Sequence, residues 1–200
     1  MPKIDSTITQ FKQIPRSPVS PRRISVVGTI GSGKSTFARK ASKILNAPYV
    51  ELDALHWEPN WLEAANEIFR ERVKHSAQND DWVIDGNYHQ VRDIVWGRAN
   101  TVVWLDYPFM TIMGRLARRT MKRIIHREEL WNGNREHLSS LVTRDSVFLW
   151  AIRTYRRRKK QYPILLGRPE NSHLRVIRLH SPREAGEFLS ALETEMAEKK

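Results

Sequence analysis

Short apolar runs rich in β-branched residues recur along this chain and alternate with longer stretches of helical periodicity. Runs of this kind, bounded by polar or turn-forming residues, are typical of β-strands. Strands that alternate with helices predict an α/β fold, in which a parallel sheet is covered by helices on both faces. The expected strands are Ile24–Val27, Tyr49–Asp53, a strand with its exit loop over Asp81–Tyr88, Thr101–Asp106 and His173–Leu179.

Apolar residues spaced three and four positions apart predict helices between these strands. Asn60 is expected to cap the helix that begins near Leu62, while Ser181 and Pro182 are expected to open the last helix. The expected helices are Thr36–Leu45, Leu62–Ser76, Val91–Trp96, Met110–Ile125, a mostly helical Arg135–Lys160 and the last helix from Ser181, with a turn at Trp131–Asn134.

A glycine-rich stretch between the first strand and the first helix fits the P-loop pattern G-x-x-x-x-G-K-[ST]. Glycines let the backbone approach a phosphate closely, and successive N–H groups then form an anion cradle at the start of a helix. In this pattern Lys34 reaches the β- and γ-phosphates, and the Ser35 hydroxyl is placed to bind Mg²⁺. We therefore expect ATP and Mg²⁺ as cofactors. The expected nucleotide-binding residues are Gly28, Thr29, Ile30, Gly31, Ser32, Gly33, Lys34, Ser35 and Thr36.

Three of the expected strands end on an acidic residue, at the sheet edge where open α/β sheets bind ligands. Asp85 and Asp106 each follow an apolar run and are alternative candidates for the acid that serves Mg²⁺, the other one capping a turn. Asp53 is either an acid or base beside the acceptor, as phosphoryl transfer requires, or an ordinary strand-end acid. The aromatic residues that follow, His56 and Trp57 among them, either stack on a base or sugar or pack the connection.

Composition narrows the class of protein. Two hundred residues suit one domain or one domain with an inserted lid, and residues 1–21 are expected to form a mobile tail before a domain over 22–200. The absence of cysteine excludes disulfides and Cys-ligated zinc. No apolar run is long enough to span a membrane and no secretory signal is apparent, so we expect a soluble cytoplasmic protein.

The net charge of +12 is concentrated in one segment. Residues 111–168 hold fifteen Lys and Arg and four Asp and Glu, a net charge of +11. Arg115, Arg119 and Arg123 recur every four residues and so share one helix face. This segment is either a lid whose arginines close over the transferred phosphoryl group or a solvated basic face.

Seven segments of the chain, taken in order, resemble the adenylate-kinase-like P-loop proteins. The resemblance covers residues 22–200 and is greatest to the DNA topology modulation (FlaR-related) group, for which WVIDGNY and ELWNGNRE are the more specific segments. The segments are GTIGSGKST, LDALHW, WVIDGNY, VVWLDYP, RLARR, ELWNGNRE and RTYRRR.

This resemblance implies a nucleoside-monophosphate-kinase-like fold with a five-stranded parallel sheet of order 2-3-1-4-5 and an arginine-rich helical lid. It implies that Asp85 is the acid linked to Mg²⁺. By position it also implies that Arg115 and Arg119 before the lid, and Arg153 and Arg156 after it, close on the phosphates. Adenylate kinases carry Asp-Gly-Phe-Pro-Arg after the third strand, whereas Asn87 and Tyr88 follow Gly86 here, so the acceptor is left open.

We therefore expect a phosphotransferase that moves the γ-phosphoryl of ATP to a small acceptor, as a monomer or homodimer without membrane contact. The catalytic candidates are Lys34, Asp53, Asp85, Arg115, Arg119, Arg153 and Arg156. Two alternatives are a nucleic-acid-associated ATPase, favoured by the basic segment, and a nucleotide-binding regulatory module without turnover.

Overall fold

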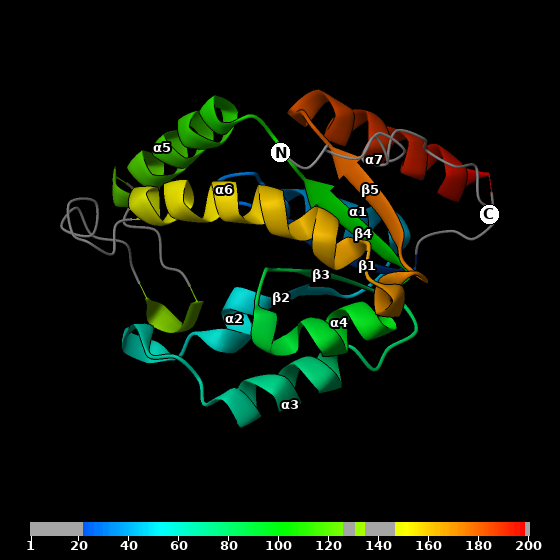
Figure 1. Ribbon diagram of the computed structural model, residues 1–200, viewed down its shortest axis with the longest axis horizontal. Helices are drawn as coiled ribbons and strands as arrows, with labels where there is room; N and C mark the ends of the chain where they lie inside the picture. Colours follow the sequence, from blue (N-terminus) through cyan, green and yellow to red (C-terminus); the bar gives the residue numbers. More distant parts are fainter. Residues whose placement is uncertain (1–21, 126–130, 135–146, 199–200) are drawn as a thin grey trace, which may run out of the picture.

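A five-stranded parallel sheet forms the centre of the computed structural model (Figure 1). The structure describes residues 22–125, 131–134 and 147–198, and the expected tail over residues 1–21 lies outside them. The strand order is β2-β3-β1-β4-β5, which confirms the expected order 2-3-1-4-5. The strands are β1 (Arg23–Gly28), β2 (Tyr49–Glu51), β3 (Trp82–Asp85), β4 (Thr101–Leu105) and β5 (Arg175–Leu179).

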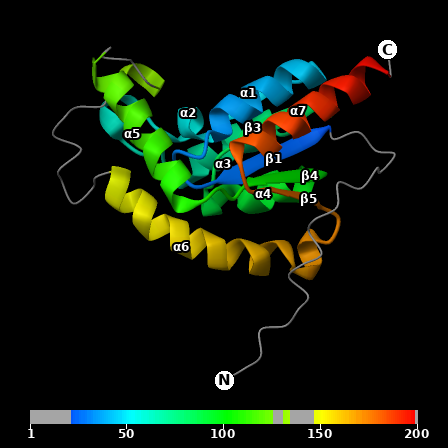
Figure 2. The same cartoon turned by 90° about the horizontal axis from the view of Figure 1, so that it is seen from above.

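The central strands are buried almost throughout, because helices cover both faces of the sheet. On one face lie α1 (Lys34–Leu45) and α7 (Pro182–Ala197), which pack together beside the sheet (Figure 2). The rings of Phe37 and Phe188 stack there with centroids 6.0 Å apart. The cap of α7 is as expected, since the Ser181 hydroxyl accepts a hydrogen bond from the Glu184 backbone N–H at 3.1 Å.

The opposite face is covered by α3 (Asn66–Ser76), α4 (Arg92–Arg98) and α6 (Val147–Leu166). Aromatic rings meet in this half of the core, where the Tyr162 ring contacts those of Trp96 and Trp104. These contacts explain why α6 continues to Leu166, beyond the expected end at Lys160. The first part of that expected helix, residues 135–146, lies outside the described ranges.

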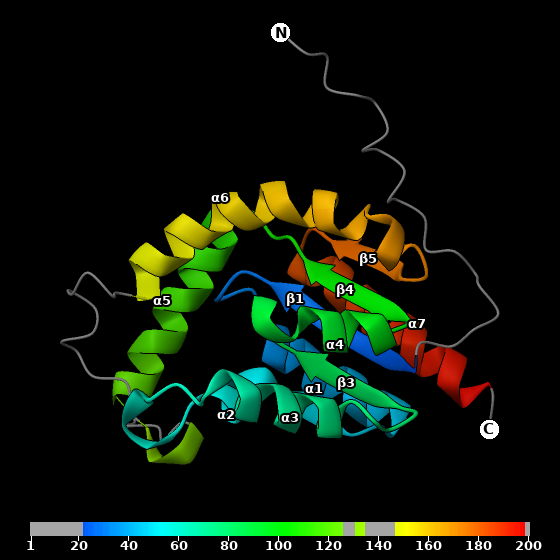
Figure 3. The same cartoon turned by 60° about the horizontal axis from the view of Figure 1, so that its bottom comes forward.

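The helix α5 (Phe109–Ile125) lies beyond the carboxyl edge of the sheet and meets α6 at an angle, where the Phe109 and Tyr155 rings are in contact (Figure 3). Between them in the chain, the short turn η4 (Trp131–Gly133) sits against α2 (Leu52–His56) and η2 (Pro59–Trp61). The other short elements are η3 (His89–Val91) and η6 (Pro169–Asn171). Of the expected lid over 111–168, residues 126–130 and 135–146 fall outside the description. None of the described helices has the length and apolar character needed to cross a bilayer.

Two sequence-based boundaries around β2 were wrong. The strand ends at Glu51, and Asp53 lies in α2, because Leu52 turns into the core at 2% exposure and starts a helix. The next helix begins at Asn66, not near Leu62, and Asn60 caps nothing. Asn60 instead adopts a left-handed conformation (φ 61°) in η2, and Leu62 is 63% exposed, so no apolar helical face forms before Asn66.

Candidate active site

The P-loop joins the end of β1 to the start of α1, as its pattern predicts. A side chain at Gly28, the last residue of β1, would place its Cβ 2.7 Å from the carbonyl oxygen of Leu105 in β4, so only glycine fits at this position. Gly31 has a left-handed φ of 83°, which few other residues adopt. Thr29 and Ser32 are buried, Ile30, Gly33, Lys34 and Ser35 are partly buried, and Thr36 is exposed on the first turn of α1.

Lys34 is the first residue of α1, with its Nζ 3.5 Å from the Thr29 carbonyl oxygen. Burial, and then the nearby charge of Arg158, lower its pKa to about 8, while Asp85 and Asp53 oppose that shift. The ammonium group therefore lies between cations and carboxylates. A polyphosphate placed here would stabilise its charged form.

The Ser35 hydroxyl lies between two carboxylates from neighbouring strands. Its Oγ is 2.8 Å from Asp85 Oδ2 and 3.1 Å from Glu51 Oε1, and Tyr49 donates a hydrogen bond to Asp85 Oδ1 at 3.1 Å. Burial raises the pKa of Asp85 to about 6; Lys34 opposes this shift and Glu51 adds to it. Two crowded carboxylates beside a hydroxyl form a hard oxygen donor set, and such a set fits Mg²⁺.

Glu51 was not among the expected site residues. It pairs with Asp85 in the β2–β3 register, and Arg39 holds it at 3.1 Å. The acidic strand end was the available signal, but the strand was expected to run on to Asp53. No group of three or more His, Asp and Glu side chains that could hold a metal occurs among the described residues.

Asp106, the alternative candidate for Mg²⁺, has another partner. It is 6% exposed, and Arg178 of β5 donates to its Oδ2 from Nε at 3.0 Å and from Nη2 at 2.5 Å. Arg178 therefore neutralises the charge of Asp106, and the ion pair links the ends of β4 and β5. The structure therefore brings Asp85, and not Asp106, to the P-loop hydroxyl.

Asp53 reaches the same edge from α2. It accepts a hydrogen bond from the Tyr88 hydroxyl at 2.7 Å, and its charge also acts on Lys34. His56 packs between the rings of Trp57, Phe69 and Tyr88, so it belongs to the packing of this connection. Burial lowers the pKa of His56, which keeps the ring neutral near pH 7.

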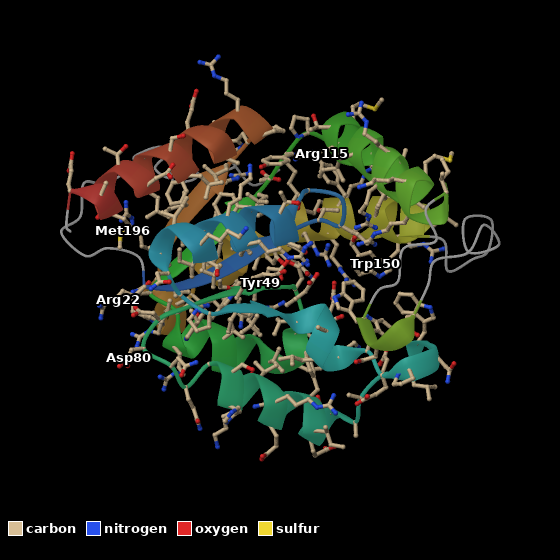
Figure 4. The ribbon with its side chains drawn as sticks, turned by 180° about the vertical axis from the view of Figure 1, so that it is seen from behind. Arg22, Tyr49, Asp80, Arg115, Trp150 and Met196 are labelled. Carbon is tan, nitrogen blue, oxygen red and sulfur yellow. The ribbon has the colours of Figure 1, made fainter. Side chains whose placement is uncertain are left out.

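The expected arginines have different environments. Arg115 projects from α5 toward the P-loop (Figure 4) and donates a hydrogen bond to the Ser32 carbonyl oxygen at 3.2 Å. Arg119 is partly buried, and its charge contributes to lowering the pKa of Lys34. Arg153 and Arg156 on α6 are both exposed.

Arg158 is the buried arginine of α6, and sequence reasoning missed it. It is 7% exposed, lies 4.8 Å from the Trp150 ring centroid and has Nη1 3.4 Å from the Gly28 carbonyl oxygen. A signal for it existed, since it falls on one helix stripe with Ala151, Thr154 and Tyr162. The basic run around it hid that stripe.

Asn87, where this chain departs from the adenylate kinase pattern, was also missed. Its Oδ1 accepts a hydrogen bond from the Gly28 N–H at 3.1 Å, and its Nδ2 donates to the Gly28 carbonyl oxygen at 2.7 Å. Tyr162 of α6 donates a further hydrogen bond to Asn87 Oδ1 at 2.7 Å. The side chain therefore ties the first P-loop glycine to β3 and α6.

No protein-family model matches the chain, and no curated protein matches it either. The resemblance to the DNA topology modulation group thus stays a prediction. Among solved structures, shikimate kinase from Acinetobacter baumannii in complex with shikimate is 14% identical, covers 90% of this chain and 96% of that one, and has a TM-score of 0.50.

Shikimate kinase from Bacteroides thetaiotaomicron is 15% identical, with 88% of this chain and 98% of that one covered at a TM-score of 0.50. A gluconokinase from Sinorhizobium meliloti 1021 is 17% identical, with 90% and 98% covered at a TM-score of 0.49. At these identities the likeness to the two shikimate kinases shows the fold. The chain has the α/β fold of the P-loop NTPases, with P-loop kinases among its structural neighbours.

Proposed function

We propose that this chain is an ATP-dependent phosphotransferase that moves the γ-phosphoryl group to a hydroxyl of a small acceptor. The observation that carries the proposal is the meeting of three parts at one sheet edge. Lys34 begins the helix after the P-loop, and the Ser35 hydroxyl lies 2.8 Å from Asp85. Asp53 lies close enough for its charge to oppose the lowering of the Lys34 pKa. Phosphoryl transfer needs these parts: a phosphate cradle, an ion-binding hydroxyl with an acid, and a carboxylate for the acceptor.

On the ATP side, the P-loop N–H groups and Lys34 hold the β- and γ-phosphates. Arg115 and Arg119 from α5, with Arg158 from α6, surround them with positive charge. This charge compensates the negative charge on the transferred group in the transition state. Exposed Arg153 and Arg156 remain candidates for contacts that form only when ATP is present.

Ser35 and Asp85 are the residues that would hold Mg²⁺, with Glu51 beside them to bind its water ligands. When bound, the ion would offset the negative charge of the phosphates during transfer. Burial raises the pKa of Asp85 to about 6; Lys34 opposes this shift and the neighbouring Glu51 carboxylate adds to it. A divalent ion would lower that pKa and keep Asp85 ionised.

On the acceptor side, Asp53 accepts the proton of the attacking hydroxyl. The acceptor O–H bond breaks as its oxygen bonds to the γ-phosphorus, and the bond from that phosphorus to the bridging oxygen breaks to release ADP. Tyr88 keeps Asp53 oriented through its 2.7 Å hydrogen bond. The shikimate kinase neighbour contains its shikimate, and the fold likeness supports a small-molecule acceptor here as well.

The test measures ADP formation from ATP and Mg²⁺ with each member of a panel of nucleosides, nucleoside monophosphates and small hydroxylated metabolites. We expect strong stimulation by one class of acceptor and loss of that stimulation in Lys34→Ala. Lys40→Ala, on the exposed side of the same helix, is the matched control and should turn over normally. Equal turnover in Lys34→Ala and the wild type would refute the proposal.

A second candidate is a nucleic-acid-associated ATPase, as the resemblance to the DNA topology modulation group suggests. The observation favouring it is the set of exposed cations on α6: Arg153, Arg156, Arg157, Lys159 and Lys160. In the same assay this function would appear as ADP formation that ignores every small acceptor and rises with DNA or RNA. Such stimulation should weaken steeply with salt, since it depends on phosphate contacts.

A further inference from the structure

The turn at 131–134 is joined to the acceptor side of the molecule by one buried side chain. Asn134 is 4% exposed, and its Oδ1 accepts a hydrogen bond from the Trp61 N–H at 2.8 Å. Its Nδ2 donates to the carbonyl oxygens of Glu58 and Trp131, each at 2.9 Å. Asn132 Nδ2 adds a hydrogen bond to the Trp57 carbonyl oxygen. We call these contacts of Asn132 and Asn134 the asparagine clasp.

The clasp holds a backbone conformation that the chain does not favour by itself. Asn60 and Trp61 have φ values of 61° and 58°, in the left-handed region, which is uncommon for residues other than glycine. Such conformations persist where the surroundings over-determine them. The Asn134 amide supplies both the acceptor and the donor that this turn requires, and an aspartate would supply only acceptors.

The clasped segment supports the acceptor carboxylate directly. Trp57 donates its backbone N–H to the Asp53 carbonyl oxygen at 3.0 Å. Its ring contacts that of His56, which in turn contacts the Tyr88 ring. Tyr88 in turn donates to the Asp53 carboxylate at 2.7 Å. A continuous set of contacts therefore runs to the Asp53 carboxylate from the turn at 131–134, which lies beside α2 in Figure 1.

A row of aromatic rings accompanies this set of contacts. The Tyr88, His56, Trp57, Trp61 and Trp131 rings follow one another with centroids 4.4 to 6.3 Å apart. Trp131 belongs to the turn at 131–134, so the row includes its ring only while the asparagine clasp holds that turn against η2.

We propose that Asn134 is a positioning residue of the acceptor site, which holds Trp57 and through it Tyr88 and Asp53. The inference rests on the proposed function. It adds that the turn at 131–134 affects how the enzyme uses its acceptor and does not affect ATP binding. Loosening the clasp would therefore impair acceptor use while the ATP side, built on β1, α1 and β3, stays intact.

The experiment compares Asn134→Asp with the wild type and with Asn79→Asp, an exposed control. Asn134→Asp should lower kcat/KM for the acceptor roughly tenfold, the scale of leaving a buried polar group without its hydrogen bond, and leave the KM for ATP unchanged. Asn132→Ala keeps the buried Asn134 and should act in the same direction more weakly, which guards against a folding defect. Acceptor kinetics equal to the wild type, or an equal loss for ATP and acceptor, would overturn the inference.

A double-mutant cycle with Tyr88→Phe separates positioning from general destabilisation. If Asn134 acts through Tyr88, the double variant should be little worse than the poorer single variant, whereas independent effects multiply. Effects that multiply would contradict the inference and would leave the proposed phosphotransferase activity unaffected.

A wild type that uses no acceptor would instead rule out the proposed function and the positioning role together. In that case NMR still tests whether the clasp reaches Trp57. The Trp57 indole N–H signal, assigned by its loss in Trp57→Phe, should shift in Asn134→Asp.

Discussion

Single polar side chains at the carboxyl edge of the sheet each have a partner that defines their role. Asp85 and Asp106 end similar apolar runs, but the first lies at the Ser35 hydroxyl and the second is neutralised by Arg178. The same contrast separates Arg158, buried at Gly28, from its exposed neighbour Arg157. At this scale the residue type indicates the chemistry that is available, and the neighbours decide which chemistry is used.

His56 provides a prediction at the residue scale, because it is buried and neutral. Burial lowers its pKa; Glu63, with an oxygen 3.9 Å from His56 Nε2, and Asp53 oppose this shift. The unfolded chain therefore takes up a proton near the ordinary pKa of about 6.5, before the folded chain does. We expect the free energy of unfolding to fall as the pH drops below about 6.5, because the unfolded state then binds more protons.

The measurement is urea unfolding between pH 5 and pH 7.5 for the wild type and His56→Phe. The variant should lose this part of the pH dependence, whereas His89→Phe, in the short turn after β3, should keep it. An identical pH dependence in the wild type and His56→Phe would show that His56 does not become charged on unfolding.

Among the helices, α6 connects distant parts of the site. One stripe of this helix carries Ala151, Thr154, Arg158 and Tyr162 into the molecule, while the rest of its basic residues face outward. Arg158 reaches the Gly28 carbonyl oxygen, and Tyr162 holds the Asn87 amide that brackets the same glycine. The helix thereby couples the aromatic core beneath the sheet to the first residue of the P-loop.

The corresponding prediction compares Arg158→Gln with Arg157→Gln. Arg158→Gln removes a buried cation next to the phosphate cradle, so we expect the KM for ATP to rise roughly tenfold or more, as for a lost charge-assisted contact. Arg157→Gln removes the same charge from the exposed side and should change this constant little. Steady-state kinetics and urea unfolding of both variants separate a binding effect from a loss of stability.

The whole molecule has two sides around one sheet edge. In the proposed function, β1, the P-loop, α1 and the β3 end would form the nucleotide side, and α2, η2 and the turn at 131–134 the acceptor side. Lys34 on the first side and Asp53 on the second lie close enough for their charges to interact. ATP should therefore bind to the nucleotide side without any acceptor.

This expectation is tested by thermal unfolding with ATP and Mg²⁺. Ligand at about one hundred times its Kd stabilises a folded protein by about 2.7 kcal/mol, which raises Tm by several degrees. We expect that rise in the wild type and Lys40→Ala and its loss in Lys34→Ala. A full rise without ADP formation for any acceptor would identify a nucleotide-binding regulatory module and not a kinase.

The sequence by itself determined the alternation of strands and helices and the P-loop, because these depend on local burial patterns and on backbone angles that glycine permits. The sheet order was predicted from the resemblance of its segments to the adenylate-kinase-like P-loop proteins. The sequence did not predict Glu51, Asn87, Arg158 or the docking of Asn134. Asn87 meets Gly28 across 59 positions, and Asn134 meets Trp61 across 73. Only the tertiary structure decided these contacts, because packing and not the neighbouring sequence places such groups within hydrogen-bond distance.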